Sequence, residues 1–465
     1  MSDTLMISVS GMRGHVGTDL TPELVARHAA ALGAWVRTAA VAQVAGSGRG
    51  PRPVVVLGRD ARTSGAMFTH AAAAGLMSVG VDVIDLGIVP TPTVQMAVEH
   101  HRAGAGLILT ASHNPIEWNA LKFVGPDGIF LDADAGARVR ALAEAGPPRM
   151  GWDGLGTVRE DRDAVARHLD AVLALPMIDT QAIRARKFHV ALDCVRGAGA
   201  YAIPPLLERL GCRVSAINLE PDGHFPRAPE PVPENLGELG ELVQRTGADI
   251  GLAVDPDVDR LALVDERGRP IGEDYTLAFA VRAVLDRRST APRNATVVVN
   301  LSTSLVVEDA ARDVGARLIR APVGEANVAR TIRDEGAVIG GEGNGGVMLP
   351  ALHIGRDAPL GVALILHLLA TSGVTVSELV AASPGYSIVK AKGPRGSELA
   401  PLYAKLRSRF SDADADDRDG LRLSWRDRWL HVRPSGTEPI VRLIAEAPTS
   451  TDAEALIGAA RELLQ

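Results

Sequence analysis

Three aspartates stand at alternate positions in the stretch AVDPDVDRLALV, at Asp255, Asp257 and Asp259. They follow the apolar run IGLAV, which indicates a buried strand that ends just before the first of them. Alternate side chains of an extended segment point the same way, so we expect the three carboxylates to converge. Like charges held this close need a cation, and oxygen-only ligands favour Mg²⁺ before Ca²⁺ or Mn²⁺. A solvated acidic turn is the weaker interpretation, because such turns rarely open from so apolar a run.

The same stretch also matches part of the EF-hand loop pattern. Asp255, Asp257, Asp259 and Glu266 fall at its positions 1, 3, 5 and 12. However, Arg260 occupies the position that needs glycine, and both flanking segments indicate strands where an EF-hand has helices. We therefore reject the EF-hand.

A second polar loop, TASHNP, follows the apolar run AGLIL and contains Ser112 and His113. Pro115 blocks a helix and restricts the residue before it, so we expect Ser112 to present a rigid, exposed hydroxyl at a bend. An ordinary polar turn is the alternative for one Ser-His pair, and the G-x-S-x-G elbow of many serine hydrolases is missing. Beside a Mg²⁺ site, a serine that carries a phosphoryl group is the better hypothesis.

Two further loops offer ligands for a sugar phosphate. In GEGNGG, glycines surround Glu342 and Asn344, which suits sugar hydroxyls, although a glycine-rich hairpin turn would explain the pattern almost as well. The loop matches G-x-G-x-x-G, but no helix follows it, so we do not predict a dinucleotide site. In RPSGTEP, an arginine fork, two hydroxyls and a backbone nest predict a phosphate grip. The grip residues are Arg433, Ser435, Gly436 and Thr437.

Short runs rich in valine and isoleucine alternate with alanine- and leucine-rich stretches, a pattern typical of an α/β chain. Ligands of open α/β sheets bind at the carboxyl ends of the strands, which is where these loops lie. The loops TASHNP, DPDVDR and GEGNGG each follow a predicted strand, so we expect the same arrangement of strands and loops to repeat along the chain. The clearest predicted strands cover 53–58, 81–87, 105–110, 188–193, 213–219, 250–255, 295–301, 316–321 and 337–341.

Length and composition limit the class of protein. The 465 residues are enough for three or four domains, with boundaries predicted after 150, 262 and 372. With 49 Lys and Arg against 56 Asp and Glu, the net charge is −7, and no basic block indicates nucleic-acid binding. Two cysteines outside any metal-ligand spacing, no secretion signal and no long apolar run predict a cytoplasmic protein without membrane association.

The four loops, in this order and at these separations, resemble the active-site loops of the α-D-phosphohexomutases along essentially the whole chain. The resemblance implies three α/β domains with mixed sheets and a smaller C-terminal α+β domain, TATA-binding-protein-like, around a central cleft. It implies that Ser112 is the phosphoserine, and that the three aspartates and its phosphate bind Mg²⁺. Lys122 of NALKF would be the general acid/base, with Arg13 of GMRG beside it.

By the same resemblance, Arg260 and His113 are further active-site candidates, and Glu342 and Asn344 contact sugar hydroxyls. The four grip residues of RPSGTEP bind the phosphate that is not being transferred. We expect a neighbouring cation, Arg13 or Arg260, to lower the pKa of Lys122 so that it can accept a proton. The expected cycle passes a phosphoryl group from Ser112 to a hexose monophosphate and back through a sugar 1,6-bisphosphate that turns over in the cleft. The C-terminal domain is expected to swing during that reorientation.

The sugar loop ends at Gly346, where many members have histidine, and it looks more like a branch often assigned to phosphoglucosamine mutases. Interconversion of glucosamine 6-phosphate and glucosamine 1-phosphate is therefore the favoured activity, and phosphomannomutase or phosphoglucomutase activity is the alternative. A silent sugar-phosphate-binding protein and a metal-dependent phosphatase are the other hypotheses. Sugar phosphates are the expected partners of a monomer or homodimer.

Overall fold

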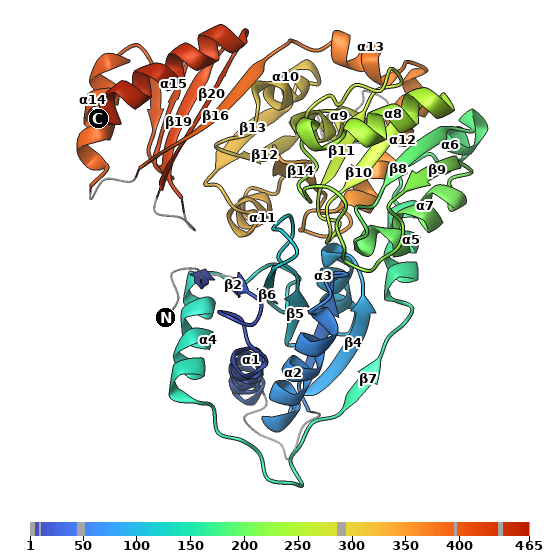
Figure 1. Ribbon diagram of the computed structural model, residues 1–465, viewed down its shortest axis with the longest axis vertical. Helices are drawn as coiled ribbons and strands as arrows, with labels where there is room; N and C mark the ends of the chain where they lie inside the picture. Colours follow the sequence, from blue (N-terminus) through green and yellow to red (C-terminus); the bar gives the residue numbers. More distant parts are fainter. Residues whose placement is uncertain are drawn as a thin grey trace.

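The computed structural model describes residues 5–8, 11–43, 52–285, 294–394, 398–435 and 440–464. Figure 1 shows a first unit at the bottom of the view, a second and a third unit above it, and a fourth unit at the upper left. Within these ranges, no helix is both long and apolar enough to cross a membrane.

The first unit is a mixed sheet of seven strands in the order β1-β2-β6-β5-β3-β4-β7. Strands β3, β4, β5 and β7 run parallel, and β6, β2 and β1 continue the sheet antiparallel. Val55 and Leu57 of β3 face one apolar cluster while Val56 faces another, so the sheet is covered on both faces, which explains its uninterrupted apolar strands. The strands are β1 (Met6–Ser8), β2 (Gly11–His15), β3 (Val54–Arg59), β4 (Asp82–Ile88), β5 (Ala105–Leu109), β6 (Trp118–Val124) and β7 (Val158–Glu160), and the helices are α1 (Pro22–Gln43), α2 (Gly65–Ser78), α3 (Thr91–His100) and α4 (Ala133–Ala145).

The second and third units are mixed four-stranded sheets, ordered β11-β10-β8-β9 and β13-β12-β14-β15. One continuous apolar cluster runs through both units, so they form a single packed body. The second unit contains α5 (Ala164–Leu173), α6 (Thr180–Arg186), β8 (His189–Asp193), α7 (Ile203–Arg209), β9 (Arg213–Ile217), α8 (Gly237–Thr246), β10 (Ile250–Val254) and β11 (Leu261–Val264), with short 3₁₀ turns at Ala198–Tyr201 and Pro233–Asn235. The third contains α9 (Asp274–Leu285), β12 (Thr296–Asn300), α10 (Leu305–Asp313), β13 (Arg317–Ala321), α11 (Glu325–Asp334), β14 (Ile339–Glu342), β15 (Gly346–Met348), α12 (Ala358–Ser372) and α13 (Val376–Ala381).

The same sheet plan occurs three times. In each unit two parallel strands joined through a helix are followed by a third parallel strand, and an antiparallel strand then pairs with that third strand. The sets are β3-β4-β5-β6, β8-β9-β10-β11 and β12-β13-β14-β15. The expected repeat is therefore present in the topology, and the three loops TASHNP, DPDVDR and GEGNGG occupy the same connection, between the third and fourth strands.

The fourth unit is a fully antiparallel sheet in the order β16-β20-β19-β18-β17 with helices packed against it. Among the described residues, its apolar cluster is built only from side chains between 389 and 464. The predicted fold class, three α/β units with mixed sheets and a C-terminal α+β unit, is thus confirmed. The elements are β16 (Ser387–Pro394), α14 (Ala400–Arg409), β17 (Asp414–Asp416), β18 (Leu421–Ser424), β19 (Trp429–Pro434), β20 (Ile440–Ala447) and α15 (Ser450–Leu464).

Strand pairing and packing continue past the positions where the sequence changes in composition. β7 joins the first sheet by pairing with β4, beyond residue 150. β11 runs through position 262 and remains in the second sheet. Val376 and Leu379 of α13 pack into the apolar cluster of the second and third units, beyond residue 372. Proline- and glycine-rich sequence marks where the chain turns, whereas pairing and packing decide which unit a segment joins.

Polar groups join the fourth unit to the third. The Glu446 carboxylate accepts hydrogen bonds from Ser304 Oγ, from the Leu305 backbone N–H at 2.8 Å and from Trp429 Nε1 at 2.5 Å. The Leu305 N–H belongs to the first turn of α10, where a carboxylate is favourable. Because Glu446 lies on β20, this buried carboxylate fixes the orientation of the fourth sheet against α10.

Candidate active site

Ser112 lies in the loop between β5 and β6, and a buried arginine from a neighbouring strand end shapes this loop. Arg62 donates to the carbonyl oxygens of Ser112 at 2.7 Å, Asn114 at 2.6 Å, Pro115 at 2.6 Å and Trp118 at 2.8 Å. It also donates from Nε to Asp60 Oδ2 at 3.0 Å. One guanidinium therefore satisfies four carbonyl groups of an irregular segment and holds its backbone in place.

Ser112 meets the second unit directly. Its Oγ donates to Asp255 Oδ2 at 2.8 Å, and its backbone N–H donates to Thr110 Oγ1 at 2.9 Å. Its φ of 48° lies in the left-handed region, which costs energy for a residue with a side chain. The side chain is not the exposed hydroxyl that the sequence predicted, since only 7% of the residue is accessible. The prediction was wrong because the loop after β10 covers the serine.

Asp255, Asp257 and Asp259 come together, with oxygen atoms within 4.8 Å of one another. An extended segment is not the cause. The backbone turns over Asp255, whose Oδ1 accepts the N–H groups of Asp259 and Arg260, each at 3.2 Å, and Val258 has a φ of 63°. The convergence is thus confirmed, but the predicted strand-like geometry is wrong.

The buried carboxylates are not satisfied by the protein alone. Among the described residues, Asp257 Oδ1 and Asp259 Oδ1 are buried without a hydrogen-bond partner. Burial, and then the charges of Asp257 and Asp259, raise the pKa of Asp255 well above its ordinary value. Unpaired oxygens and mutual repulsion in a buried, all-oxygen site suit a hard divalent cation such as Mg²⁺.

Lys122 of β6 joins the aspartates. Its Nζ lies 2.7 Å from Asp257 Oδ2 and 3.9 Å from Asp259 Oδ2. Burial acts to lower the pKa of Lys122, but the charges of these two carboxylates outweigh it and raise the pKa above its ordinary value. The predicted lowering by Arg13 or Arg260 is therefore wrong, because the Asp257 and Asp259 carboxylates stabilise the ammonium form.

Two arginines, Arg13 and Arg260, and the imidazole of His113 lie near the serine loop. Arg13 of β2 donates to Asn114 Oδ1 at 3.1 Å, and Arg260 lies 3.1 Å from Glu230 Oε1.

The charge of Arg260, then burial and the charge of Arg13, lower the pKa of His113 well below its ordinary value, so its imidazole is neutral. Its Nδ1 lies 3.4 Å from Ser112 Oγ. Burial, Arg260 and then Arg442 of the fourth unit lower the pKa of Arg13, which places cations of three units around one space. Such a cluster attracts anions.

The sugar-loop candidates lie at the end of β14. Glu342 is buried and accepts from Asn300 Nδ2 at 2.9 Å and from the Gly324 N–H at 3.1 Å. Arg356 binds its other oxygen at 2.9 Å. Asn344 Oδ1 accepts from the Gly346 N–H at 3.3 Å and so closes the turn. Glu342 is thereby linked to the aspartates through Arg356, while Asn344 shapes the loop.

The predicted phosphate grip is described only in part. Arg433 of β19 pairs with Asp419, with Nε 3.1 Å from Oδ2. Ser435 is buried, and its backbone N–H donates to the Ile440 carbonyl at 2.9 Å. Gly436 and Thr437 lie outside the described residues. Asp419 also accepts the Val323 N–H of the third unit at 3.0 Å, so Arg433 lies at the junction of the two units.

Sequence reasoning missed several residues of this site. Thr91, at the start of α3, donates from Oγ1 to Asp257 Oδ2 at 2.8 Å. Arg62 and Arg356 also play no part in the predicted loops. A search of every strand end for polar residues would have found Arg62 in GRDARTSG, because this segment follows β3.

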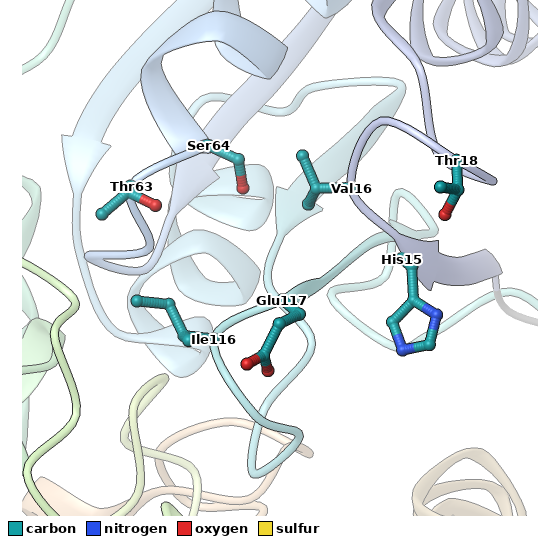
Figure 2. Close-up of a pocket in the computed structure, with 7 residues that line it drawn as sticks. All are labelled: His15, Val16, Thr18, Thr63, Ser64, Ile116 and Glu117. Carbon is teal, nitrogen blue, oxygen red and sulfur yellow. The ribbon is translucent and has the colours of Figure 1, made fainter.

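A shallow open depression of about 630 Å³ lies beside the segment that follows Ser112. Figure 2 shows Ile116 and Glu117 of this segment facing Thr63 and Ser64 on one side and the end of β2 on the other. The described residues that line it differ from the candidates above: His15, Val16, Thr18, Thr63, Ser64, Ile116 and Glu117. The depression thus borders the serine loop from outside.

Comparison with known proteins agrees with the geometry. Four family models match successive parts of the chain, namely phosphoglucomutase/phosphomannomutase alpha/beta/alpha domains I, II and III and the C-terminal domain, at residues 5–149, 166–268, 272–386 and 389–463. A probable phosphoglucosamine mutase of Methanopyrus kandleri is 37% identical over 96% of this chain and 95% of its own. A phosphoglucomutase/phosphomannomutase of Thermococcus kodakarensis is also 37% identical, over 98% and 97%.

The solved structures show the same architecture. The crystal structure of a phosphoglucomutase/phosphomannomutase family protein from Burkholderia thailandensis superposes with a TM-score of 0.85 at 26% identity, over 100% of this chain and 97% of that one. A phosphoryl-transfer enzyme needs charged groups that position and neutralise the phosphoryl group. This site has buried carboxylates, a serine hydroxyl that contacts them and a cluster of cations. The chain therefore belongs to the phosphoglucomutase/phosphomannomutase family and is a phosphohexomutase.

Proposed function

We propose that this phosphohexomutase interconverts glucosamine 6-phosphate and glucosamine 1-phosphate through a phosphoserine at Ser112. The observation that carries the phosphoserine assignment is the 2.8 Å contact between Ser112 Oγ and Asp255, inside a site surrounded by cations. The relative from Methanopyrus kandleri named probable phosphoglucosamine mutase supports the amino sugar as substrate. The Thermococcus relative keeps glucose and mannose phosphates as the competing candidates.

The three aspartates and the Ser112 phosphate would hold Mg²⁺, since two buried carboxylate oxygens lack partners in this part of the chain. Bound there, the ion supplies positive charge that neutralises the phosphoryl group during transfer. Arg260 and Arg13 add charge from the protein side, where burial makes their electrostatic effect larger than in water. The neutral imidazole of His113 can donate one N–H hydrogen bond to an oxygen of the transferred group.

Each half-reaction moves one phosphoryl group. The bond between Ser112 Oγ and phosphorus breaks as a bond from phosphorus to a sugar hydroxyl oxygen forms, which gives a sugar 1,6-bisphosphate. After the sugar turns over, the serine oxygen takes back the phosphoryl group from the other end. In each half-reaction the attacking hydroxyl loses a proton and the oxygen that leaves phosphorus gains one. The Lys122 ammonium can donate to the leaving oxygen and, as the amine, take the proton of the attacking hydroxyl, so that its own charge is restored.

The remaining candidates bind the parts of the substrate that do not react. We assign sugar hydroxyls to Glu342 and Asn344, which must serve both orientations of the bisphosphate. We assign the distal phosphate to the grip of the fourth unit, which comprises Arg433, Ser435, Gly436 and Thr437. Binding energy at these positions orients the reacting end at the serine.

The substrate assignment is tested with purified, Ser112-phosphorylated protein, Mg²⁺ and trace sugar bisphosphate. We expect kcat/KM for glucosamine 1-phosphate to exceed that for glucose 1-phosphate and mannose 1-phosphate by about a hundredfold, or about 2.7 kcal/mol in transition-state terms. Equal or better turnover of the other two would overturn the amino-sugar assignment while leaving the mutase chemistry intact.

The phosphoserine assignment is tested with Ser112→Ala, and with Ser78→Ala at the far end of α2 as the matched control. We expect Ser112→Ala to abolish turnover with the thermal midpoint retained, and Ser78→Ala to turn over like the wild type. Phosphorus NMR of the reaction separates a mutase from a phosphatase, since a phosphatase accumulates inorganic phosphate. Turnover largely retained in Ser112→Ala would refute the assignment.

A further inference from the structure

Arg356 connects the loop that contains Asp259 with the loop that contains Glu342. It lies between β15 and α12 and is buried. Its Nη2 lies 2.6 Å from Asp259 Oδ2 and 3.1 Å from Glu325 Oε2, and its Nη1 lies 2.9 Å from Glu342 Oε2. One guanidinium therefore touches both a candidate metal ligand and a candidate sugar-binding carboxylate. A planar fork suits such bridging, which a lysine ammonium cannot reproduce in full.

Arg356 also favours the ionised form of Glu342. Burial acts to raise the pKa of Glu342, but Arg356, followed by the hydrogen bonds from Asn300 and Gly324, outweighs burial and lowers it. An ionised carboxylate can accept only, which is what a sugar hydroxyl donor needs. Without the guanidinium, burial would count more heavily against the ionised form of this carboxyl group.

Gly346 provides the space for Arg356. A Cβ atom at position 346 would lie 2.2 Å from Arg356 Cδ and 2.7 Å from Cγ, distances that would force the arginine to move. The φ of Gly346 is not in the left-handed region, so its backbone does not itself require glycine. The glycine at 346 and the arginine at 356 therefore depend on each other.

We propose that Arg356 is a positioning residue that couples the metal loop to the sugar loop, with Gly346 as the residue that admits it. This inference rests on the proposed function, because it takes Asp259 as a metal ligand and Glu342 as a sugar ligand. Asp259 and Glu342 both contact Arg356. A change in the charge or position of one carboxylate therefore changes the interaction of Arg356 with the other. Binding of a divalent cation at the aspartates and of a sugar phosphate at Glu342 is therefore interdependent, and the dependence is reciprocal.

The coupling is measured by isothermal titration calorimetry of Mg²⁺ into the full chain, with and without saturating glucose 1,6-bisphosphate. We expect the bisphosphate to change the Mg²⁺ dissociation constant of the wild type by about fivefold or more. This factor should fall close to one in Arg356→Gln and be partly restored in Arg356→Lys. Arg282→Lys, which alters a partly buried Arg282–Asp313 pair elsewhere in the third unit, should keep the wild-type factor.

If Arg356→Gln is unstable, a double-mutant cycle of Gly346→Ala and Arg356→Ala provides a second test. Gly346→Ala should raise the KM for the sugar phosphate in the presence of Arg356 but much less in an Arg356→Ala background, where the clash is absent. Additive effects on KM, or an undiminished coupling factor in Arg356→Gln, would overturn the inference. Wild-type protein that binds Mg²⁺ but shows neither bisphosphate binding nor turnover would instead overturn the proposed function.

Discussion

Arg62 should be the strongest single determinant of the serine loop, and Arg62→Met tests this. The guanidinium is fully buried and holds four carbonyl oxygens of residues 112–118 as well as the carboxylate of Asp60. Methionine keeps much of the side-chain volume but removes every donor and the charge. Asp60 is then left buried without its counter-ion.

Breaking a buried ion pair by removing one partner costs about 3–5 kcal/mol. For a unit of this size, that loss corresponds to a fall of roughly 6 to 20 °C in the unfolding midpoint of the first unit. The loss should also grow with pH. Burial already raises the pKa of Asp60, and Arg62 is the main opposing influence, so its removal raises the pKa further. A carboxyl group with a raised folded-state pKa loses stability as pH rises, so the deficit is larger at pH 8 than at pH 5.

Differential scanning calorimetry at pH 5 and pH 8 measures both effects, and turnover reports on the loop. Arg52→Met is the matched control, since Arg52, just before β3, forms a half-exposed pair with Asp82 of β4, 3.9 Å apart. We expect this control to change the midpoint by less than about 2 °C. An Arg62→Met protein that melts with the wild type at both pH values and retains its kcat would refute the assigned role of Arg62.

Two further predictions concern the junction of the third and fourth units. Burial lowers the pKa of His431 to about 4, so its stabilising effect is complete above its ordinary pKa and is lost as pH falls from about 6.5 toward 4. Calorimetry should show that the wild type loses about 2 kcal/mol of unfolding free energy between neutral pH and pH 5 relative to His431→Gln. The contribution of position 431 in that variant should not depend on pH in this range. Parallel stability curves for the two proteins would contradict this prediction. Burial raises the pKa of Asp274 to about 8, so stability is lost as pH rises between about 4 and 8. Asp274→Asn should therefore raise the midpoint at pH 8 and leave it nearly unchanged at pH 4, with exposed Asp313→Asn as the control; an equal shift at both pH values would rule this out.

The fold and the location of the site could be predicted because they follow from local patterns. Apolar runs such as IGLAV and AGLIL are buried on both faces of a sheet, so their strands are found within one or two residues of the predicted bounds. The ends of parallel strands lie at one edge, so polar loops that follow them are brought to a common place. This rule brings Ser112 and Asp255 together although they are far apart in the sequence.

What could not be predicted depends on contacts between distant residues. A valine at 258 with a φ of 63° contradicts its own preference, so the turn that gathers the aspartates leaves no local signal. Arg62 and Arg356 lie in polar turns, and the carbonyls and carboxylate that show their roles, such as Pro115 and Asp259, lie far along the chain. The charge of Lys122 likewise depends on how near Asp257 lies, a distance that spacing alone does not provide.

The separate apolar core of the fourth unit has a consequence for the temperature dependence of its motion. Its described contacts with the third unit include the carboxylate of Glu446 and the imidazole of His431, and the fully buried Trp429 lies beside Glu446 outside the unit's own apolar cluster. Rotation of this unit would exchange hydrogen bonds for water while leaving that cluster closed. Because heat-capacity changes follow apolar exposure, such an opening would carry a smaller change in heat capacity than the unfolding of a core. The balance between its orientations would then vary with temperature along a less curved van't Hoff line than the stability of the cores themselves.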